Sequence, residues 1–116
     1  MGAGEKYKVI VLPAANARYL DSILPHIDRN FSFDRVIEID ITIRLTVLSL
    51  EHHPNRGALE LMIEKNVKQF RYILFRETRF FELKILYFVN EEHHTVYVTD
   101  FFPTVMHPKR LGKSEK

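Results

Sequence analysis

The chain has no cysteine, only four glycines, and no apolar run long enough to span a bilayer. The missing cysteines exclude disulfide bonds, thiolate nucleophiles and cysteine-ligated metal. The glycines form no phosphate-binding loop and no serine lies in a G-x-S-x-G setting, so nucleotide-binding and serine-hydrolase functions find no support. A membrane span needs about 20 apolar residues, and the polar start of the chain is unlike a secretory signal. We therefore expect a cytoplasmic protein that does not enter a membrane.

The residues that are present fit one folded unit. The chain has 116 residues, of which 46% are hydrophobic and 28% charged, and such values are typical of a globular protein with a real core. No internal repeat and no linker is visible. We expect a single domain over residues 1–116, with flexible ends at about 1–6 and 110–116.

The strongest structural signal lies between Glu82 and Pro108. Two runs rich in β-branched and aromatic residues, Leu83–Val89 and Thr95–Phe102, flank a short polar segment. This pattern predicts a β-hairpin. Large side chains on both alternation sets predict strands in the interior of a sheet. The hairpin should therefore form the centre of the fold.

The segments before and after this hairpin predict further strands and a helix. Tyr7–Leu12 reads as a first strand, and the proline that follows suits the first position of a helix. That helix has an apolar stripe, and Pro25 should kink or end it near Leu24. The stripe consists of Ala17, Leu20, Leu24 and Ile27. From Gly57 on, Ala58–Ile63, Gln69–Glu77 and the two hairpin runs predict an antiparallel meander of four strands. From Pro103 on, we expect a tail that wraps around the domain or frays.

Residues Ser32 to Leu50 allow two interpretations. Apolar and polar residues alternate strictly from Ile37 to Val47, which is typical of a strand. A length of about 18 residues is excessive for a strand and natural for a helix, and Ser32 could cap that helix. In the helix, one face would carry Phe33, Ile37, Ile41, Leu45 and Leu48.

Positive charge is concentrated between Lys65 and Lys84. This segment has six basic and two acidic residues, a local excess of four, although the whole chain carries only +2. The basic residues are Lys65, Lys68, Arg71, Arg76, Arg79 and Lys84. A basic stripe among aromatic residues could face phosphates or an acidic partner. The alternative, which composition alone favours, is a solvated strand edge protected by charge against aggregation.

Two pairs of adjacent histidines suggest metal ligands at first sight. They are His52–His53 and His93–His94. Adjacent side chains on a strand or loop point apart, and no acidic or thiol partner stands at a ligand spacing. We predict solvated loop histidines and no metal site.

Five segments together carry a resemblance to a known family. They are YKVIVLPAANARYL, HHPNRG, FRYILF, LKILYFV and VYVTDFF with its following HP. In this order they resemble the RelE/ParE superfamily of type II toxins over about residues 7–111. The resemblance implies an α+β fold with an N-terminal strand, two helices and an antiparallel meander of about four strands, the helices packing on one face of a twisted sheet. It also favours the helix for Ser32–Leu50, against the periodicity.

The ribonuclease branch of this family implies a metal-independent site without cofactors. Cations on one sheet face would stabilise the attack of a 2′-hydroxyl on the adjacent phosphate, and an acid would protonate the leaving oxygen. The resemblance assigns Arg71, Lys84 and His107 to catalysis. It assigns contacts with nucleic acid or a partner to Arg76, Arg79, Lys109 and Arg110. The match is partial, because Ile73 and Thr104 stand where the pattern has a lysine and an arginine. Both this catalytic arrangement and the resemblance itself predict that Arg71 and Lys84 lie on the same face of the sheet.

This incomplete set favours the ParE-like branch, which inhibits growth by binding DNA gyrase. We therefore expect the toxin of a plasmid-stabilising toxin–antitoxin system. One alternative is a RelE-like endonuclease that cuts mRNA on the ribosome, and a second is a non-toxic protein-binding module on the same fold. A toxin implies a cognate antitoxin whose acidic segment folds along it. The chain could form a homo-oligomer or a toxin–antitoxin hetero-oligomer.

Overall fold

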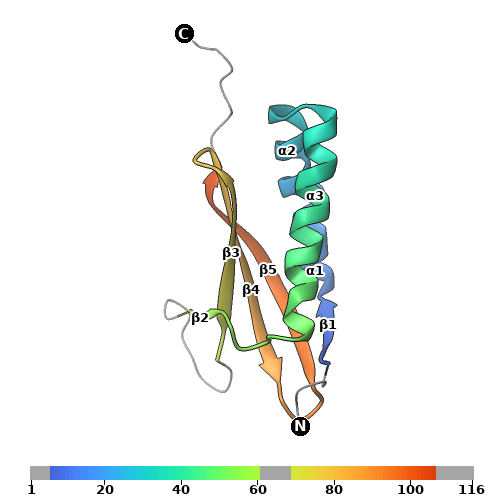
Figure 1. Cartoon of the computed structure of the whole chain (residues 1–116), viewed down its shortest axis with the longest axis vertical. Helices are drawn as coiled ribbons and strands as arrows, with labels where there is room; N and C mark the ends of the chain where they lie inside the picture. Colours follow the sequence, from blue (N-terminus) through green and yellow to red (C-terminus); the bar gives the residue numbers. More distant parts are fainter. Residues whose placement is uncertain (1–5, 61–68, 107–116) are drawn as a thin grey trace.

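The protein is an α+β domain, seen in a computed structural model that describes residues 6–60 and 69–106 (Figure 1). One strand precedes a helical layer, and four strands follow it. In chain order the elements are β1 (Lys8–Val11), α1 (Pro13–Arg18), the π-helix η1 (Tyr19–Ile23), α2 (Leu24–Asn30), α3 (Phe33–Leu48), the 3-10 helix η2 (Ser49–Glu51), β2 (Ala58–Leu59), β3 (Arg71–Thr78), β4 (Phe81–Asn90) and β5 (Thr95–Met106). The expected fold class is confirmed.

The strands form one five-stranded sheet in the order β1-β5-β4-β3-β2. The β4–β5 hairpin lies at its centre, as predicted, and β1 pairs in parallel with β5 at one edge. β5 continues to Met106, so the expectation of a tail from Pro103 is wrong for its first residues. Pro103 lies opposite Leu83 beside a register shift. A bulge of this kind tolerates a residue that lacks an N–H. Residues 107–116 lie outside the described part.

The helical segments cover one face of the sheet, and α3 runs along the strands for much of their length (Figure 1). A single core fills the space between the two layers. The helical layer contributes Ala15, Tyr19, Ile23, Ile27, Ile39, Ile43, Val47 and Leu50, and the sheet contributes Ile73, Phe75, Phe81, Leu83, Ile85, Tyr87, Val96, Val98 and Phe101.

The ambiguous segment is a helix, as the resemblance implied. Ser32 caps it, because its Oγ accepts a hydrogen bond from the Arg35 N–H at 3.3 Å. The strand-like alternation persists within this helix and sets its two faces. Residues two apart on a helix lie about 200° apart, so alternating apolar side chains fall on opposite sides. One side, with Ile39 and Ile43, is buried, and the other, with Ile37 and Ile41, is exposed.

The first helical stretch differs from the prediction. Pro25 is expected to kink or end the helix near Leu24, but the helical stretch does not end there: η1 widens it just before Pro25, and α2 continues from Leu24. A π-type turn is one way in which a helix accommodates a proline that cannot donate its N–H. The predicted apolar stripe is wrong in part, since Leu20 is 45% exposed and Ala17 is also exposed. The buried apolar positions are Ala15, Tyr19, Ile23 and Ile27.

Among the described residues, none of the helices combines the length and the hydropathy that a membrane crossing requires.

Candidate functional site

The sheet face turned away from the helices carries Lys84 near its centre. In the register, Lys84 lies between Leu74 of β3 and Phe102 of β5. As the alternation predicted, Lys84 shares this open face with the half-buried Leu86 and Phe88. The residues between them belong to the core on the other side of the sheet. A lysine therefore stands within an apolar and aromatic surface.

The charge of Lys84 is already compensated. Its Nζ lies 2.6 Å from the Glu60 Oε1, and the two side chains are only 20% and 6% exposed. The same ammonium lies 4.3 Å from the centre of the Tyr72 ring, within the range of a cation–π interaction. Because removing either partner would leave a charge with little solvent around it, we interpret this pair as fixed structure. Lys84 is not a cation held ready for a phosphate.

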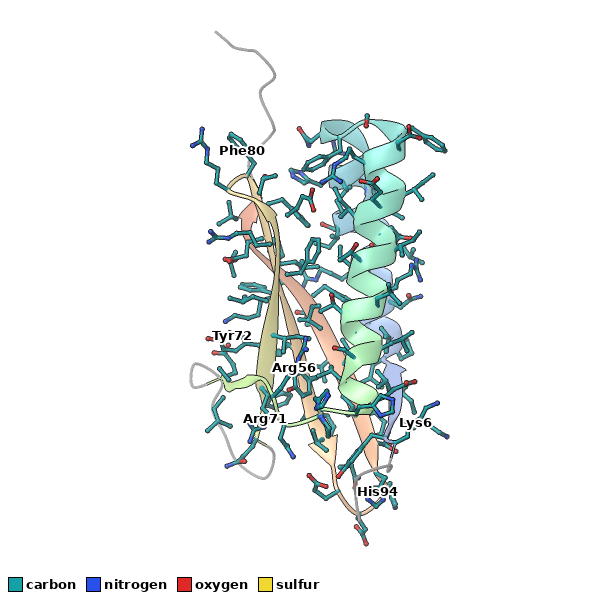
Figure 2. The ribbon with its side chains drawn as sticks, viewed as in Figure 1. Lys6, Arg56, Arg71, Tyr72, Phe80 and His94 are labelled. Carbon is teal, nitrogen blue, oxygen red and sulfur yellow. The ribbon has the colours of Figure 1, made fainter. Side chains whose placement is uncertain are left out.

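Arg71 lies on the opposite face of the sheet. It pairs with Tyr87 in the register and lies on the same face of β3 as the buried Ile73, which is the face turned towards the helices. Figure 2 shows its neighbour Tyr72 on the side away from α3. Arg71 Nη1 donates to the carbonyls of Gly57 at 2.8 Å and Asn55 at 3.3 Å. The Tyr87 hydroxyl accepts a hydrogen bond from the Gly57 N–H at 3.0 Å.

These contacts give Arg71 a structural role. Arg71 and Tyr87 hold both polar groups of the Gly57 backbone, and so anchor the loop from η2 to β2 against the sheet. Arg71 also lines a polar hollow of about 430 Å³ at the end of the sheet, where Asn90 and Glu91 are among the other lining residues. The lining of the hollow thus includes a carboxylate as well as a guanidinium, and this negative charge opposes the binding of a phosphate.

The predicted pairing of Arg71 with Lys84 on a shared catalytic face is wrong. Cations that stabilise one transferring phosphate must converge on it from the same side, whereas the sheet separates these two. The third predicted member, His107, lies outside the described residues. Lys109 and Arg110 lie outside them as well.

The remaining cations do not form a continuous basic stripe in the described part of the chain. Arg76 pairs with Glu82 across the β3–β4 hairpin at 3.2 Å. Arg79 occupies the turn of this hairpin, with its guanidinium 5.2 Å from the centre of the Phe80 ring. Lys65 and Lys68 lie outside the described residues. Thr104, which stands where the family pattern has an arginine, donates a hydrogen bond to Glu82 at 2.6 Å. This bond, together with Arg76, lowers the pKa of the Glu82 carboxyl.

Aromatic and aliphatic side chains make the open face of the sheet largely apolar. The rings of Phe88 and Tyr97 stack at 5.2 Å, and Phe70 meets Phe88 edge to face at 5.7 Å. Leu74 and Phe102 are about half exposed. A surface with apolar rings and paired charges fits another protein better than a polyanion.

The histidine pairs lie in loops, as predicted. His52, His53, His93 and His94 are all exposed. The Tyr7 ring packs against the His94 ring at 4.8 Å. Over residues 6–60 and 69–106, no three His, Asp or Glu side chains come together as a metal site would require.

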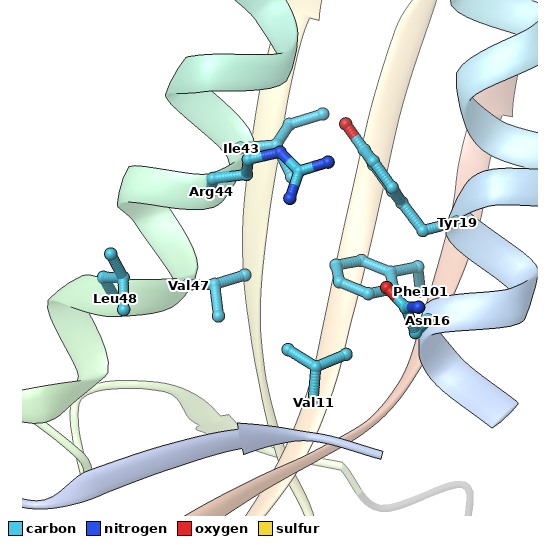
Figure 3. Close-up of a pocket in the computed structure, with 8 residues that line it drawn as sticks. All are labelled: Val11, Asn16, Tyr19, Ile43, Arg44, Val47, Leu48 and Phe101. Carbon is cyan, nitrogen blue, oxygen red and sulfur yellow. The ribbon is translucent and has the colours of Figure 1, made fainter. Parts of the chain in front are cut away.

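A second hollow, of about 280 Å³, lies between η1 and α3, with Val11 and Phe101 among its lining residues (Figure 3). Tyr19 and Arg44 face each other across it, with the guanidinium 5.6 Å from the ring centre. The Tyr19 hydroxyl donates to Asp40 at 2.5 Å, and Arg44 Nε donates to the same carboxylate at 3.0 Å. Burial raises the pKa of the Tyr19 hydroxyl, and so does Asp40.

Sequence reasoning missed this cluster. The spacing of Asp40 and Arg44 would have signalled an ion pair on a helix, but the π-helix that positions Tyr19 has no clear sequence signature. The hollow is lined mainly by apolar side chains, so it can accept an apolar group.

Comparison of the chain with models of protein families, with curated proteins and with solved structures finds no match. The resemblance to RelE/ParE toxins therefore stays a hypothesis drawn from the sequence.

Proposed function

We propose that this chain is the toxin of a type II toxin–antitoxin system and inhibits growth by binding an essential protein such as DNA gyrase. Two observations support the toxin. The segments that carry the resemblance fall on corresponding elements, since FRYILF lies at the start of β3 and VYVTDFF lies in β5. The order of one strand, a helical layer and a four-stranded meander is the order that the resemblance implies.

The separation of Arg71 and Lys84 is the observation that favours a binding mode over a catalytic one. Arg71 is bonded to backbone carbonyls on one side of the sheet and Lys84 to Glu60 on the other. A ribonuclease needs its cations on a common face, whereas a gyrase-binding toxin does not use them. Because Arg71 and Lys84 lie on opposite faces, a shared cationic face no longer supports the resemblance to RelE/ParE toxins. The proposal therefore depends on the order of the resembling segments along the chain.

The apolar open face is where we place contacts with an antitoxin or target. Within the described residues, β2 pairs with β3 at Arg71 and Tyr72 alone, and the Glu60 N–H still reaches the Phe70 carbonyl at 2.8 Å. By alternation, the backbone groups of Leu74 and Arg76 point to the same edge of β3, beyond the end of β2. Such an edge accepts an added strand. Since the described cations are largely engaged, apolar contacts rather than an acidic segment should dominate.

Induced expression in a bacterial host tests the proposal. We expect growth to stop, a reporter plasmid to lose supercoiling, and incorporation of labelled amino acids to continue at first. Co-expression of the small neighbouring reading frame should restore growth. Immediate arrest of translation with cleaved messages would replace the gyrase mode by the ribonuclease mode. Undisturbed growth at confirmed expression would reject the toxin and leave a binding module.

A further inference from the structure

The outer side of α3 carries an apolar stripe that none of the described residues covers. The stripe consists of Phe33, Ile37, Ile41, Leu45 and Leu48, which are 74%, 43%, 50%, 60% and 46% exposed. These five make up more than half of the nine large hydrophobic residues that are exposed in the described part of the chain. Single exposed apolar residues are normal on a protein surface, but a row along one helix marks an interaction site.

The size of the stripe is sufficient for a weak interface. Together, these side chains expose on the order of 500 Å², which is at the upper end of a monomer's largest patch. Pairing two such stripes would bury on the order of 1,000 Å², near the lower limit for a specific interface. The expected complex is therefore concentration-dependent.

The pattern of the stripe is suited to a second copy of the same helix. Ile41 stands at its centre, Ile37 and Leu45 lie four residues to either side, and Phe33 and Leu48 mark the ends. If two α3 helices pair antiparallel about Ile41, Ile37 of one copy meets Leu45 of the other. Ile41 meets its own equivalent, as a two-fold interface requires. We propose that the chain forms a dimer through antiparallel pairing of α3.

The charges around the stripe favour this direction over the parallel one. Asp34 lies within the first turn of the stripe. A parallel pair would place the two Asp34 carboxylates against each other, whereas the antiparallel pair separates them by about 20 Å along the helix axis. Like charges that meet across an interface are unfavourable.

The flanks of the stripe agree with the same arrangement. Asp40 and Arg44 lie on one flank and already pair with each other at 3.0 Å. Glu38 lies on the other flank and pairs with Arg35 of its own helix. In an antiparallel pair each flank meets its own equivalent, so Arg44 of one copy approaches Asp40 of the other. A parallel pair would instead bring Asp40 near Glu38 of the other copy.

Light scattering of the purified full chain, made by cell-free synthesis, tests the dimer independently of the proposed function. We expect the mass to rise from monomer towards dimer with concentration, and Ile41→Glu to keep the chain monomeric at every concentration. Leu74→Glu is the matched control, because Leu74 is 49% exposed but lies on the sheet. This variant should dimerise like the unchanged chain. A monomer at all concentrations, or a dimer unaffected by Ile41→Glu, would overturn the proposal.

The lack of cysteine allows the direction of pairing to be read by cross-linking. Under mild oxidation Ile41→Cys should form a disulfide-linked dimer, because the two positions meet at the two-fold axis. Phe33→Cys should not, since the pairing places its two copies about 24 Å apart along the axis. Equal cross-linking of Phe33→Cys and Ile41→Cys would indicate parallel helices and reject the antiparallel arrangement. Circular dichroism of each variant would confirm that it is folded.

Discussion

Tyr19 connects η1 to α3 through a partly buried hydrogen bond. Tyr19 is 4% exposed, and its hydroxyl donates a hydrogen bond to the Asp40 carboxylate. Tyr19→Phe keeps the ring and removes this bond, so the free energy of unfolding should fall by about 1–2 kcal/mol. Urea unfolding at neutral pH measures the change. Tyr7→Phe is the control, because the Tyr7 hydroxyl donates to Glu91 at an exposed site, and it should lose clearly less.

The same tyrosine makes stability depend on alkaline pH. Burial raises the pKa of the Tyr19 hydroxyl, with a further contribution from Asp40, so the folded chain keeps a proton that the unfolded chain loses above about pH 10. Stability therefore falls as the pH rises past that value. Tyr19→Phe should flatten the decline without abolishing it, because burial also raises the pKa of Tyr87. An unchanged slope in the variant would show that Tyr19 ionises freely.

Gly57 is required because there is no space for a side chain at its position. A Cβ there would lie 2.5 Å from the Tyr72 carbonyl oxygen and 2.6 Å from the Tyr87 hydroxyl. We expect Gly57→Ala to reduce the free energy of unfolding by about 1–3 kcal/mol, the usual range for overpacking. In a Tyr87→Phe background the loss should be smaller, since one of the two clashing oxygens is absent. A neutral Gly57→Ala would mean that the loop is not held against β3.

At the scale of elements, α2 is attached to the sheet through a buried histidine. His26 is 5% exposed and stacks on the Phe81 ring at 5.9 Å, and its Nε2 has no hydrogen-bond partner among the described residues. Burial lowers the pKa of His26, and the neighbouring Arg29 lowers it further. The folded chain therefore resists a proton that the unfolded chain binds near pH 6.5.

Stability should consequently fall as the pH is lowered through about 6.5, because the unfolded state then binds more protons than the folded state. His26→Leu removes the titrating group while keeping an apolar contact, so its stability should vary less between neutral pH and about pH 5. Thermal unfolding across this range measures the difference. His93→Gln, at an exposed loop position, should retain the slope of the unchanged chain. A parallel loss of slope in both variants would contradict the assignment to His26.

The elements were predictable to different degrees for physical reasons. The β4–β5 hairpin and β3 could be predicted because local alternation and a short turn determine them. The helix α3 could not be predicted from periodicity, because its apolar residues serve two faces and so repeat every second residue. The sequence therefore did not show which of the two faces is exposed. That follows from the structure, in which Ile39, Ile43 and Val47 are buried.

The candidate site shows the limit of such reasoning. Alternation correctly placed Lys84 with Leu86 and Phe88, within a single strand. The relation between Arg71 and Lys84 depends on the register of two strands, in which Arg71 pairs with Tyr87 and Lys84 with Leu74. A shift of one residue in the register reverses the faces. The turn at Thr78–Phe81 sets that register, and the sequence did not define its geometry.

At the scale of the whole molecule, the parallel pairing of β1 with β5 joins the two ends of the described chain. The N–H groups of Lys8 and Leu12 reach the carbonyls of His94 at 2.9 Å and Val98 at 3.0 Å. The N–H of Ile10 points to β5 between them, by the alternation of the ladder. β1 also contacts η2, because the Tyr7 N–H reaches the Glu51 carbonyl at 2.8 Å. The edge strand thus connects the sheet to the end of the helical layer.

A proline at Ile10 should therefore weaken the entire fold rather than fray one edge. Ile10→Pro removes the central N–H of this ladder, whereas Ile10→Ala keeps the N–H although it truncates the side chain further, so any greater loss in the proline variant comes from the backbone. We expect the proline variant to be less stable than the alanine variant by at least about 2 kcal/mol. Circular dichroism of the backbone and fluorescence of the tyrosines should report one shared unfolding transition in both variants. If the proline variant instead lost only part of its β signal while Tyr19 and Tyr87 stayed buried, β1 would be a separable strand and the sheet would fold without it.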